Sequence, residues 1–274
     1  MIAHIDKALK SFGGFVRYYD TTEPLPKLAS LVSAGDCRKV VACCGGGDQA
    51  LTMLGAGTGK GVLWAVDINP AQLFVLAAKS AFLRKKKIMP SFGQIQQAYP
   101  GMAAPVKKND RHLQKVYLRH TVTGKMIAVP AQAAKKYSLL EGDEMHVLRN
   151  SGPYWKDDRS FISRIRARLG LLRFARMDIF DSPDHFKQGT LDLIYISDIF
   201  WPQTLAYFQA RLARMAGLLR PGGRIISYLD GGDDFMGEGI SPGRMLALQA
   251  KEFSLKIDAD KSSGYLVLER IRRR

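Results

Sequence analysis

Short, uninterrupted apolar runs alternate along the chain with stretches whose apolar residues recur every three or four positions. The first pattern is typical of buried strands and the second of amphipathic helices. We expect strands at residues 39–44, 61–66, 172–177, 191–196 and 224–228, and helices at 2–12, 28–32, 49–54, 70–83, 161–169 and 204–219. Strands that alternate with helices predict a mostly parallel sheet covered on both faces, a doubly wound α/β fold.

Two segments depart from this alternation. Residues 253–257 and 265–268 flank a polar segment that contains glycine, which predicts an antiparallel hairpin closing the sheet. Residues 103–151 are too long for a simple crossover, and strands are expected there at 115–120 and 125–129. We interpret 103–151 as a β-rich insertion in a larger Rossmann-like domain formed by residues 1–102 and 152–274.

Composition places the chain among ordinary soluble globular proteins, with 46% hydrophobic and 24% charged residues. Asp6 and Lys7 interrupt the first apolar residues, so the start does not resemble a secretory signal. The three cysteines include an adjacent pair in an apolar run, which suits a reducing compartment and predicts a cytoplasmic protein. The five histidines are scattered without the spacing of metal ligands, so no metal site is predicted.

The formal net charge is +16, from 41 Lys and Arg residues against 25 Asp and Glu residues. Part of the excess is clustered at residues 84–87 and 270–274, although each cluster alone could be a solvated surface. A positive field attracts nucleic acid, anionic membrane or an anionic substrate. We therefore expect contact with an anionic partner, with peripheral membrane contact favoured over nucleic acid.

The first candidate for chemistry is a glycine-rich turn, Gly45-Gly46-Gly47, between the strand at 39–44 and the next helix. Glycine lets a cofactor approach the backbone closely, and the helix that follows offers free N–H groups at its start. The turn also matches the glycine spacing of the NAD fingerprint, with Ala50 at the third position. A tight turn without a ligand is the plain alternative.

Polar residues end the next strands. Asp67 comes about 20 positions after Gly47, where a carboxylate can accept both ribose hydroxyls of a nucleoside. Asp178 ends the third strand near the expected position of an adenine amino group, and Ser197 and Asp198 end the fourth, near the reacting part of a cofactor. Each acid could instead cap a helix.

Residues 219–224, Leu-Arg-Pro-Gly-Gly-Arg, together with the terminal hairpin resemble the class I S-adenosylmethionine (SAM)-dependent methyltransferases. The resemblance covers most of the chain outside the insertion and implies SAM as cofactor. It implies that Gly45, Gly47 and Asp48 border the methionine part, Asp67 the ribose, and Asp178 and Ile179 the adenine. The cofactor contacts expected beside them are Gly46, Ile68 and Ser197.

Three pieces, at residues 44–51, 65–73 and 195–201, are similar to a narrower family. These are the betaine-lipid synthases, which move the 3-amino-3-carboxypropyl group of SAM to diacylglycerol. That family carries Ser-Asn where this chain has Ser197-Asp198, and the segment 19–24 resembles its approach segment loosely. This resemblance implies a lipid or small-molecule acceptor, and the candidate catalytic residues are Asp198, Tyr19 and Glu23.

Residues 123–130 and 140–147 of the insertion are similar to a swapped-hairpin module of bacterial DNA-binding regulators, although a generic hairpin is the simpler interpretation. Such modules form interlocked dimers, so the resemblance implies that a homodimer could form through the insertion.

Four functions remain open from the sequence. The leading hypothesis is aminocarboxypropyl transfer from SAM, and the second is methyl transfer at the same site. The third is a nucleic-acid-binding protein that senses a cofactor, and the fourth is an NAD oxidoreductase.

Overall fold

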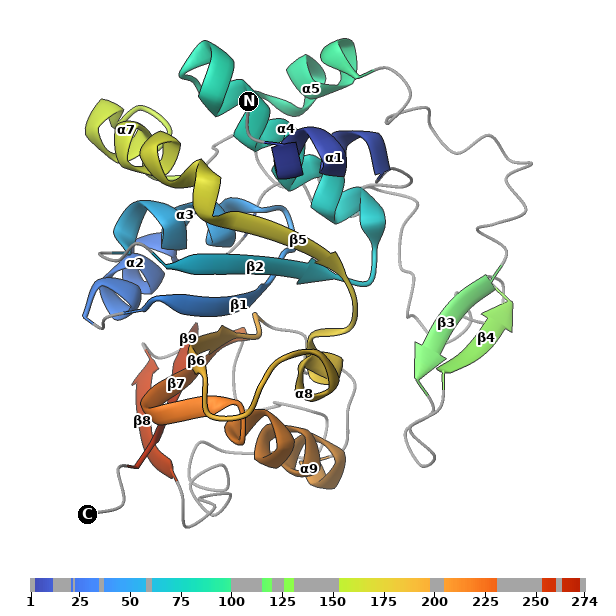
Figure 1. Cartoon of the computed structure of the whole chain (residues 1–274), viewed down its shortest axis with the longest axis vertical. Helices are drawn as coiled ribbons and strands as arrows, with labels where there is room; N and C mark the ends of the chain where they lie inside the picture. The colour runs from blue at the N-terminus through green and yellow to red at the C-terminus, as the bar shows by residue number, and fades with distance from the viewer. Residues whose placement is uncertain are drawn as a thin grey trace.

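The computed structural model describes residues 3–11, 21, 23–34, 37–57, 61–99, 115–119, 126–130, 153–197, 205–230, 253–259 and 263–271. Within them, seven strands form one sheet in the order β5-β2-β1-β6-β7-β9-β8 (Figure 1). The strands are β1 (Lys39–Cys43), β2 (Val62–Asp67), β5 (Leu172–Arg176), β6 (Leu191–Tyr195), β7 (Leu219–Asp230), β8 (Phe253–Ala259) and β9 (Ser263–Arg270).

The sheet confirms the predicted fold class. The strands β5, β2, β1, β6 and β7 pair in parallel, and the hairpin β8–β9 adds two antiparallel strands beside β7. The chain runs outward from β1 through β2 to β5 and then returns to place β6 on the other side of β1. The strand order therefore reverses between β1 and β6, which is where ligands bind in open α/β sheets.

Helices cover both faces of the sheet. Side chains from β1 alternate between two cores: Val40 and Ala42 face one, and Val41 faces the other. The first core is covered by α1 (Ala3–Ser11), α2 (Leu25–Ser33), α3 (Asp48–Ala56), α4 (Pro70–Lys86) and α7 (Arg159–Arg168). The second is covered by η3 (Ile179–Asp181) and α9 (Leu205–Ala216), and α8 (Ser182–His185) contacts both of these.

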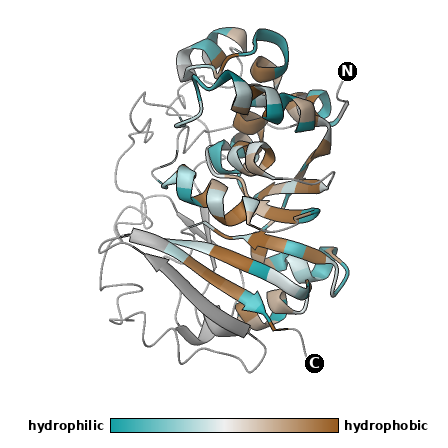
Figure 2. Cartoon of the chain, turned by 90° about the vertical axis from the view of Figure 1, so that its left-hand side faces the viewer, coloured by the Kyte–Doolittle hydropathy of each residue, from teal (hydrophilic) through white to brown (hydrophobic). Residues whose placement is uncertain are grey.

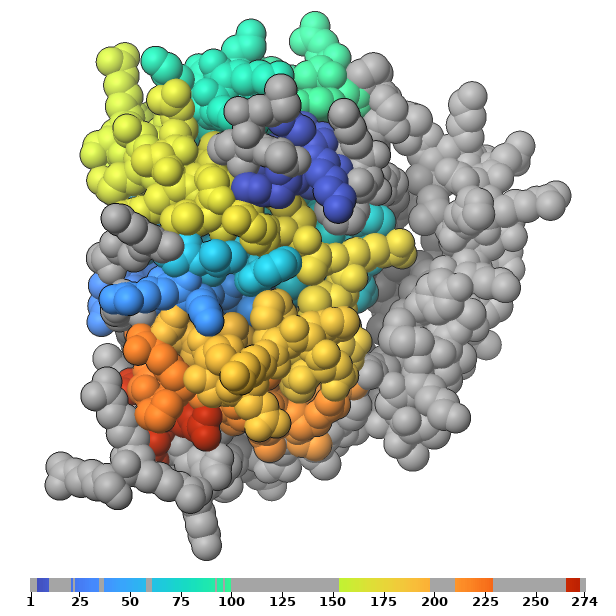
Figure 3. Space-filling view, in the orientation of Figure 1, coloured from blue at the N-terminus to red at the C-terminus, as the bar shows by residue number. Residues whose placement is uncertain are grey.

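The colouring by hydropathy shows apolar residues concentrated along the strands and polar residues on the outer surfaces of the helices (Figure 2). In the space-filling view, α1, α4 and α7 lie together on the side of the sheet that β5 forms (Figure 3). No helix in the described ranges is both long enough and apolar enough to cross a membrane.

Several elements differ from the sequence expectation, and the short helices η3 and α8 were not expected. The strand expected at 224–228 begins earlier, because β7 includes the Pro-Gly-Gly segment as an irregularity: its register against β6 shifts between Leu191 and Leu193. Gly222 has φ +79° there, a conformation that favours glycine. The helix α5 (Phe92–Ala98) was not expected, and Ser91 and Gln94 form a capping box at its start.

The predicted hairpin of the insertion is confirmed in part. β3 (Lys115–Arg119) and β4 (Met126–Pro130) pair antiparallel as a separate two-stranded sheet. The rest of the expected insertion, and with it the predicted dimer contact, lies outside the described residues.

The close contact between α3 and α7 gives a test of the packing. A Cβ added at Gly55 would lie 2.1 Å from the ring of Phe161, which is stacked on Trp155 with ring centroids 5.7 Å apart. We expect Gly55→Ala to lower the free energy of unfolding by about 1–3 kcal/mol, because the ring has little room to move. Urea denaturation would measure the loss.

Gly170→Ala is the matched control, since nothing lies within 4 Å of its added Cβ. Adding Phe161→Leu to Gly55→Ala should recover part of the loss. Equal stabilities of the two single variants would contradict the packing described for α3 and α7.

Candidate functional site

The glycine-rich turn lies at the carboxyl end of β1, beside the switch point. Gly45 and Gly47 have φ angles of +49° and +89°, in the left-handed region. A Cβ at Gly47 would lie 3.0 Å from Cβ of Leu76 and 3.1 Å from its Cα, so this position is also closed by packing against α4. Conformation and close approach both require glycine at residue 47.

Two side chains of α4 hold the carbonyls of this turn. Gln72 donates its Nε2–H to the Gly45 carbonyl at 2.8 Å, and Lys79 donates from Nζ to the Gly46 carbonyl at 2.9 Å. In a trans peptide the C=O and N–H point in opposite directions. The N–H of Gly46 therefore points away from Gln72 and α4.

Lys79 also forms a buried ion pair with Asp48, the first residue of α3. The Nζ–Oδ1 distance is 2.8 Å, and the exposed fractions of the two side chains are 0% and 1%. Burial raises the pKa of Asp48, and the charge of Lys79 opposes that rise. A carboxylate thus already occupies the helix start that would otherwise attract an anion.

Asp67 joins the glycine turn to the end of β2. Its Oδ2 accepts the Gly45 N–H at 3.2 Å and its Oδ1 accepts the Asn69 N–H at 2.8 Å. Asn69, rather than Asp67, caps α4 by accepting the N–H of Ala71 at 2.9 Å. A carboxylate has about four acceptor positions, so Asp67 keeps capacity for ribose hydroxyls.

The charge state of Asp67 is sensitive to its surroundings. Burial raises its pKa to about 6, and the nearby charge of Asp178 adds to the rise. The backbone N–H groups of Asn69 and Gly45 act in the opposite direction. Asp67 therefore titrates close to neutral pH.

The residues expected at the adenine, Asp178 and Ile179, have structural contacts of their own. Asp178 caps η3 by accepting the Phe180 N–H at 2.9 Å. The side chain of Ile179 is 2% exposed and packs in the second core, whereas Ile68, directly after Asp67, is 59% exposed. Ile68 is thus the open apolar side chain beside the carboxylate.

Another acidic residue, Glu23, lies beside the carboxyl end of β6. It is 7% exposed, and its two oxygens accept hydrogen bonds from the hydroxyls of Tyr195 and Ser197. Thr21 Oγ1 accepts both the Glu23 N–H at 3.2 Å and Nε2–H of Gln49, on α3, at 2.8 Å. The approach segment is therefore tied to both α3 and β6.

The register places this group next to the glycine turn. Ala42 of β1 pairs with Tyr195 of β6, and paired strands lie about 4.8 Å apart. Cys44 and Ser197 follow two residues later, just past the ends of β1 and β6. Ser197 has φ +53°, and its carbonyl accepts the Ser227 hydroxyl at 2.8 Å. The other catalytic candidates, Tyr19 and Asp198, lie outside the described residues.

Two tyrosines extend the Glu23 cluster across the sheet. Tyr228 of β7 and Tyr265 of β9 are buried, with ring centroids 5.3 Å apart. The Tyr265 hydroxyl is buried beside Glu23. Burial first, and the charge of Glu23 second, raise the pKa of Tyr265, so its hydroxyl stays protonated.

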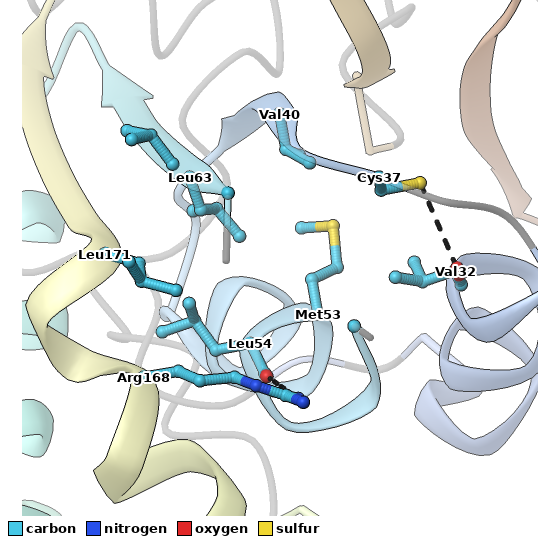
Figure 4. A pocket seen from close by; sticks show the side chains of 11 residues that line it. Val32, Cys37, Val40, Met53, Leu54, Leu63, Arg168 and Leu171 are labelled. Atoms are coloured by element: carbon cyan, nitrogen blue, oxygen red, sulfur yellow. Dashed lines mark hydrogen bonds between the residues drawn. The ribbon is translucent and has the colours of Figure 1, made fainter. Parts of the chain in front are cut away.

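A hollow at the opposite edge of the sheet is separate from these groups. It is lined mainly by apolar residues, among them Val40, Leu63 and Met53, with Arg168 at one side (Figure 4). Val40 and Leu63 lie near the amino ends of β1 and β2. None of its described lining residues is acidic, and it is not the candidate site.

The sequence did not reveal the roles of Lys79, Gln72, Tyr195 and Tyr265. For Lys79 a signal was present: residues 73–83 of α4 are almost entirely apolar or small, as in a buried helix. A lysine inside such a run must find a partner, because an unpaired buried charge is costly.

No protein-family model and no curated protein sequence matches the chain. Its fold is similar to that of the N-methyltransferase NodS from Bradyrhizobium japonicum WM9 in complex with S-adenosyl-L-homocysteine, at 9% identity and TM-score 0.45, over 99% of this chain and 98% of that one.

A putative rRNA-methylase from Clostridium thermocellum is 11% identical over 92% of this chain and 99% of its own, with TM-score 0.42. A possible exported protein from Bordetella parapertussis is 10% identical over 90% and 67%, with TM-score 0.46. Such distant similarity carries no residue, ligand or activity over to this chain.

The buried ion pair gives a prediction for stability. Lys79→Met leaves Asp48 buried without its cation, so we expect a loss of about 3–5 kcal/mol in the free energy of unfolding at pH 7. Burial favours the protonated acid, so the loss should shrink as the pH falls and Asp48 takes up a proton. Urea denaturation at several pH values between about 4.5 and 7 would measure both the loss of stability and its dependence on pH.

The exposed Lys85, on the same helix, provides the control: Lys85→Met should change stability by less than about 0.5 kcal/mol. The double variant Asp48→Asn/Lys79→Met should regain part of the loss. A Lys79→Met protein as stable as Lys85→Met would show that the pair does not hold the turn.

Proposed function

We propose that the chain is a SAM-dependent methyltransferase. The observation that carries the proposal is the glycine turn bound to Asp67 at the switch point of the sheet. Asp67 accepts the Gly45 N–H and is the only acid described at the end of β2, beside the exposed Ile68. This arrangement offers a nucleoside a carboxylate for its ribose and an apolar surface for its base.

The start of α3 favours SAM over a dinucleotide. A dinucleotide places its pyrophosphate at the start of the helix after the glycine turn. In this chain that helix begins with Asp48, buried and paired with Lys79. The methionine part of SAM carries an ammonium group as well as a carboxylate, which suits an acidic helix start better than a pyrophosphate does.

The residue roles follow from this placement. We assign Gly45, Gly46, Gly47 and Asp48 to the methionine part, Asp67 to the ribose, and Ile68 with the Asp178–Ile179 segment to the adenine. SAM supplies a sulfonium whose attached carbons are electrophilic. The chain's own contribution is to position the cofactor and the acceptor and to manage the acceptor's proton.

Aminocarboxypropyl transfer is the second candidate, because three segments resemble the enzymes that perform it. Two of them have structural roles here. Asp67, Asn69 and Gln72 hold the glycine turn and cap α4, and Asp48 pairs with Lys79. These residues bear on how the turn is held rather than on which carbon reacts, so methyl transfer, typical of the fold, is preferred.

The product decides between the two. The purified chain would be incubated with SAM and an extract of metabolites and lipids, and the nucleoside products separated by mass spectrometry. We expect S-adenosylhomocysteine that depends on the extract and is lost in Asp67→Ala. 5′-Methylthioadenosine instead would identify aminocarboxypropyl transfer, and no binding of SAM by calorimetry would refute both.

The titration of Asp67 predicts how binding depends on pH. Only the ionised carboxylate accepts hydrogen bonds at both oxygens, and the pKa of Asp67 is about 6. Affinity for SAM should therefore fall as the pH decreases through 6 and be roughly tenfold weaker at pH 5 than at its plateau. Calorimetric titrations at several pH values would measure this.

Asp67→Asn is the control, because its amide does not titrate. It should bind SAM more weakly than the natural chain at neutral pH and show no step near pH 6. A step of the same size in both proteins would assign the titration to another group.

A further inference from the structure

Basic side chains gather at the amino ends of the parallel strands, an edge of the sheet that we call the amino-end edge. It lies opposite the candidate site, and β1 begins there with the exposed Lys39. The helix α4 starts after the carboxyl end of β2 and runs back, so its last turn and Lys87 come to this edge. Arg84 agrees with this placement, because it bonds Asp6 of α1, and α1 reaches the Leu169 carbonyl just before β5.

The helix α7 continues this basic surface. Figure 1 shows α7 at the tails of the β2 and β5 arrows, and it packs against α3. Arg164 and Arg168 each donate a hydrogen bond to the Gly55 carbonyl at 3.2 Å. A carbonyl has no net charge, so these bonds fix the guanidinium groups at the surface without neutralising them. The exposed bases of the amino-end edge include Lys39, Lys85, Lys86, Lys87, Arg159 and Arg164.

Fewer acids are described at the amino-end edge. Asp6 and Asp192 each form an ion pair with an arginine, and Asp158 caps α7. Asp157 and Glu269 are exposed. The exposed bases described at this edge outnumber its exposed acids, so the edge carries a positive field, which attracts an anionic surface.

Large apolar side chains are exposed among these bases. Four large hydrophobic residues are exposed in the described ranges, and one of them, Ile68, lies beside the candidate site. The other three lie at the amino-end edge: Ile88 after Lys87, Tyr154 ahead of α7, and Ile271 after β9, with exposed fractions of 44%, 48% and 47%. Apolar side chains interspersed with basic ones are typical of surfaces that lie on an anionic bilayer.

Lys87 occupies a position where glycine would be less strained. It ends α4 with φ +60°, in the left-handed region, where glycine is the usual residue after a helix. A lysine in this conformation costs stability, and its side chain is exposed. A contact outside the chain explains a charged side chain at this position better than folding does.

We propose that the amino-end edge is the surface by which this protein binds an anionic membrane. The basic side chains lie against the lipid headgroups, and Ile88 and Tyr154 enter the boundary with the acyl chains. Nucleic acid is less suited, because its phosphate backbone offers an exposed isoleucine no apolar surface. Asp67 ends β2 at the opposite edge, so the candidate site faces away from the bilayer. The surface therefore anchors the protein and does not deliver the acceptor.

Sedimentation with lipid vesicles tests the surface without SAM. The full chain would be mixed with vesicles of equal parts phosphatidylserine and phosphatidylcholine, and with vesicles of phosphatidylcholine alone. We expect binding to the first kind that weakens as salt is added, and little binding to the second. Lys86→Gln should weaken binding to the anionic vesicles by about fivefold, the usual contribution of one basic residue near such a surface.

Arg176→Gln is the matched control, because Arg176 is exposed at the carboxyl end of β5 and the variant loses the same charge. It should bind the anionic vesicles within about twofold of the natural chain. Lys87→Gly should weaken binding by about fivefold yet resist urea at least as well as the natural chain, so the weaker binding cannot come from unfolding. Ile88→Ser keeps the charge and should weaken binding by about threefold or more.

Three results would overturn the proposal. The natural chain would not bind the anionic vesicles, or Arg176→Gln would weaken binding as much as Lys86→Gln, which would assign the effect to net charge alone. In the third, Ile88→Ser would bind the vesicles as the natural chain does, while Lys87→Gly would lose binding to double-stranded RNA, which would make the edge a nucleic-acid surface. Each result leaves the proposed function standing, because the binding of SAM is measured separately.

Discussion

The candidate site depends on the contacts of the buried Lys79 ammonium group. It bonds to the Gly46 carbonyl and to Asp48, which joins the glycine turn and the start of α3 to a single position on α4. A charge with no exposure to water cannot lose its partners cheaply, so the turn cannot shift unless Lys79 moves with it. Together with Gln72 at the neighbouring carbonyl, this contact shapes the turn before any cofactor arrives, and such preorganisation favours binding.

The periodicity of the sequence predicted the sheet because buried parallel strands read as continuous apolar runs. It could not predict the irregular start of β7, since Pro221 and the glycines after it read equally as a turn. The helix α5 was missed although Ser91 and Gln94 have capping-box spacing, because it is short. For the site, the glycines and Asp67 were visible locally, whereas the pairing of Glu23 with Tyr195 joins residues 172 positions apart, which no local pattern contains.

Helix capping was the alternative to ligand binding for the acids at the strand ends. The structure shows which of these residues cap a helix and which do not. Asp178 does cap η3, and Asn69 caps α4, so Asp67 is left free of that task. Instead Asp67 is held by two backbone N–H groups in a site buried enough to raise its pKa to about 6. A carboxyl group whose pKa is raised towards neutral pH by burial is more characteristic of a ligand site than of a structural cap.

Three carboxylates meet near the switch point of a chain whose net charge is +16: Asp48, Asp67 and Glu23. Each is stabilised differently, by a lysine, by backbone N–H groups and by hydroxyls. The charge of Asp48 is balanced by Lys79, whereas the oxygens of Asp67 accept backbone N–H groups. Under the proposed function, Asp67 holds the ribose of SAM, and the pair of Asp48 with Lys79 fixes the start of α3 beside the methionine part.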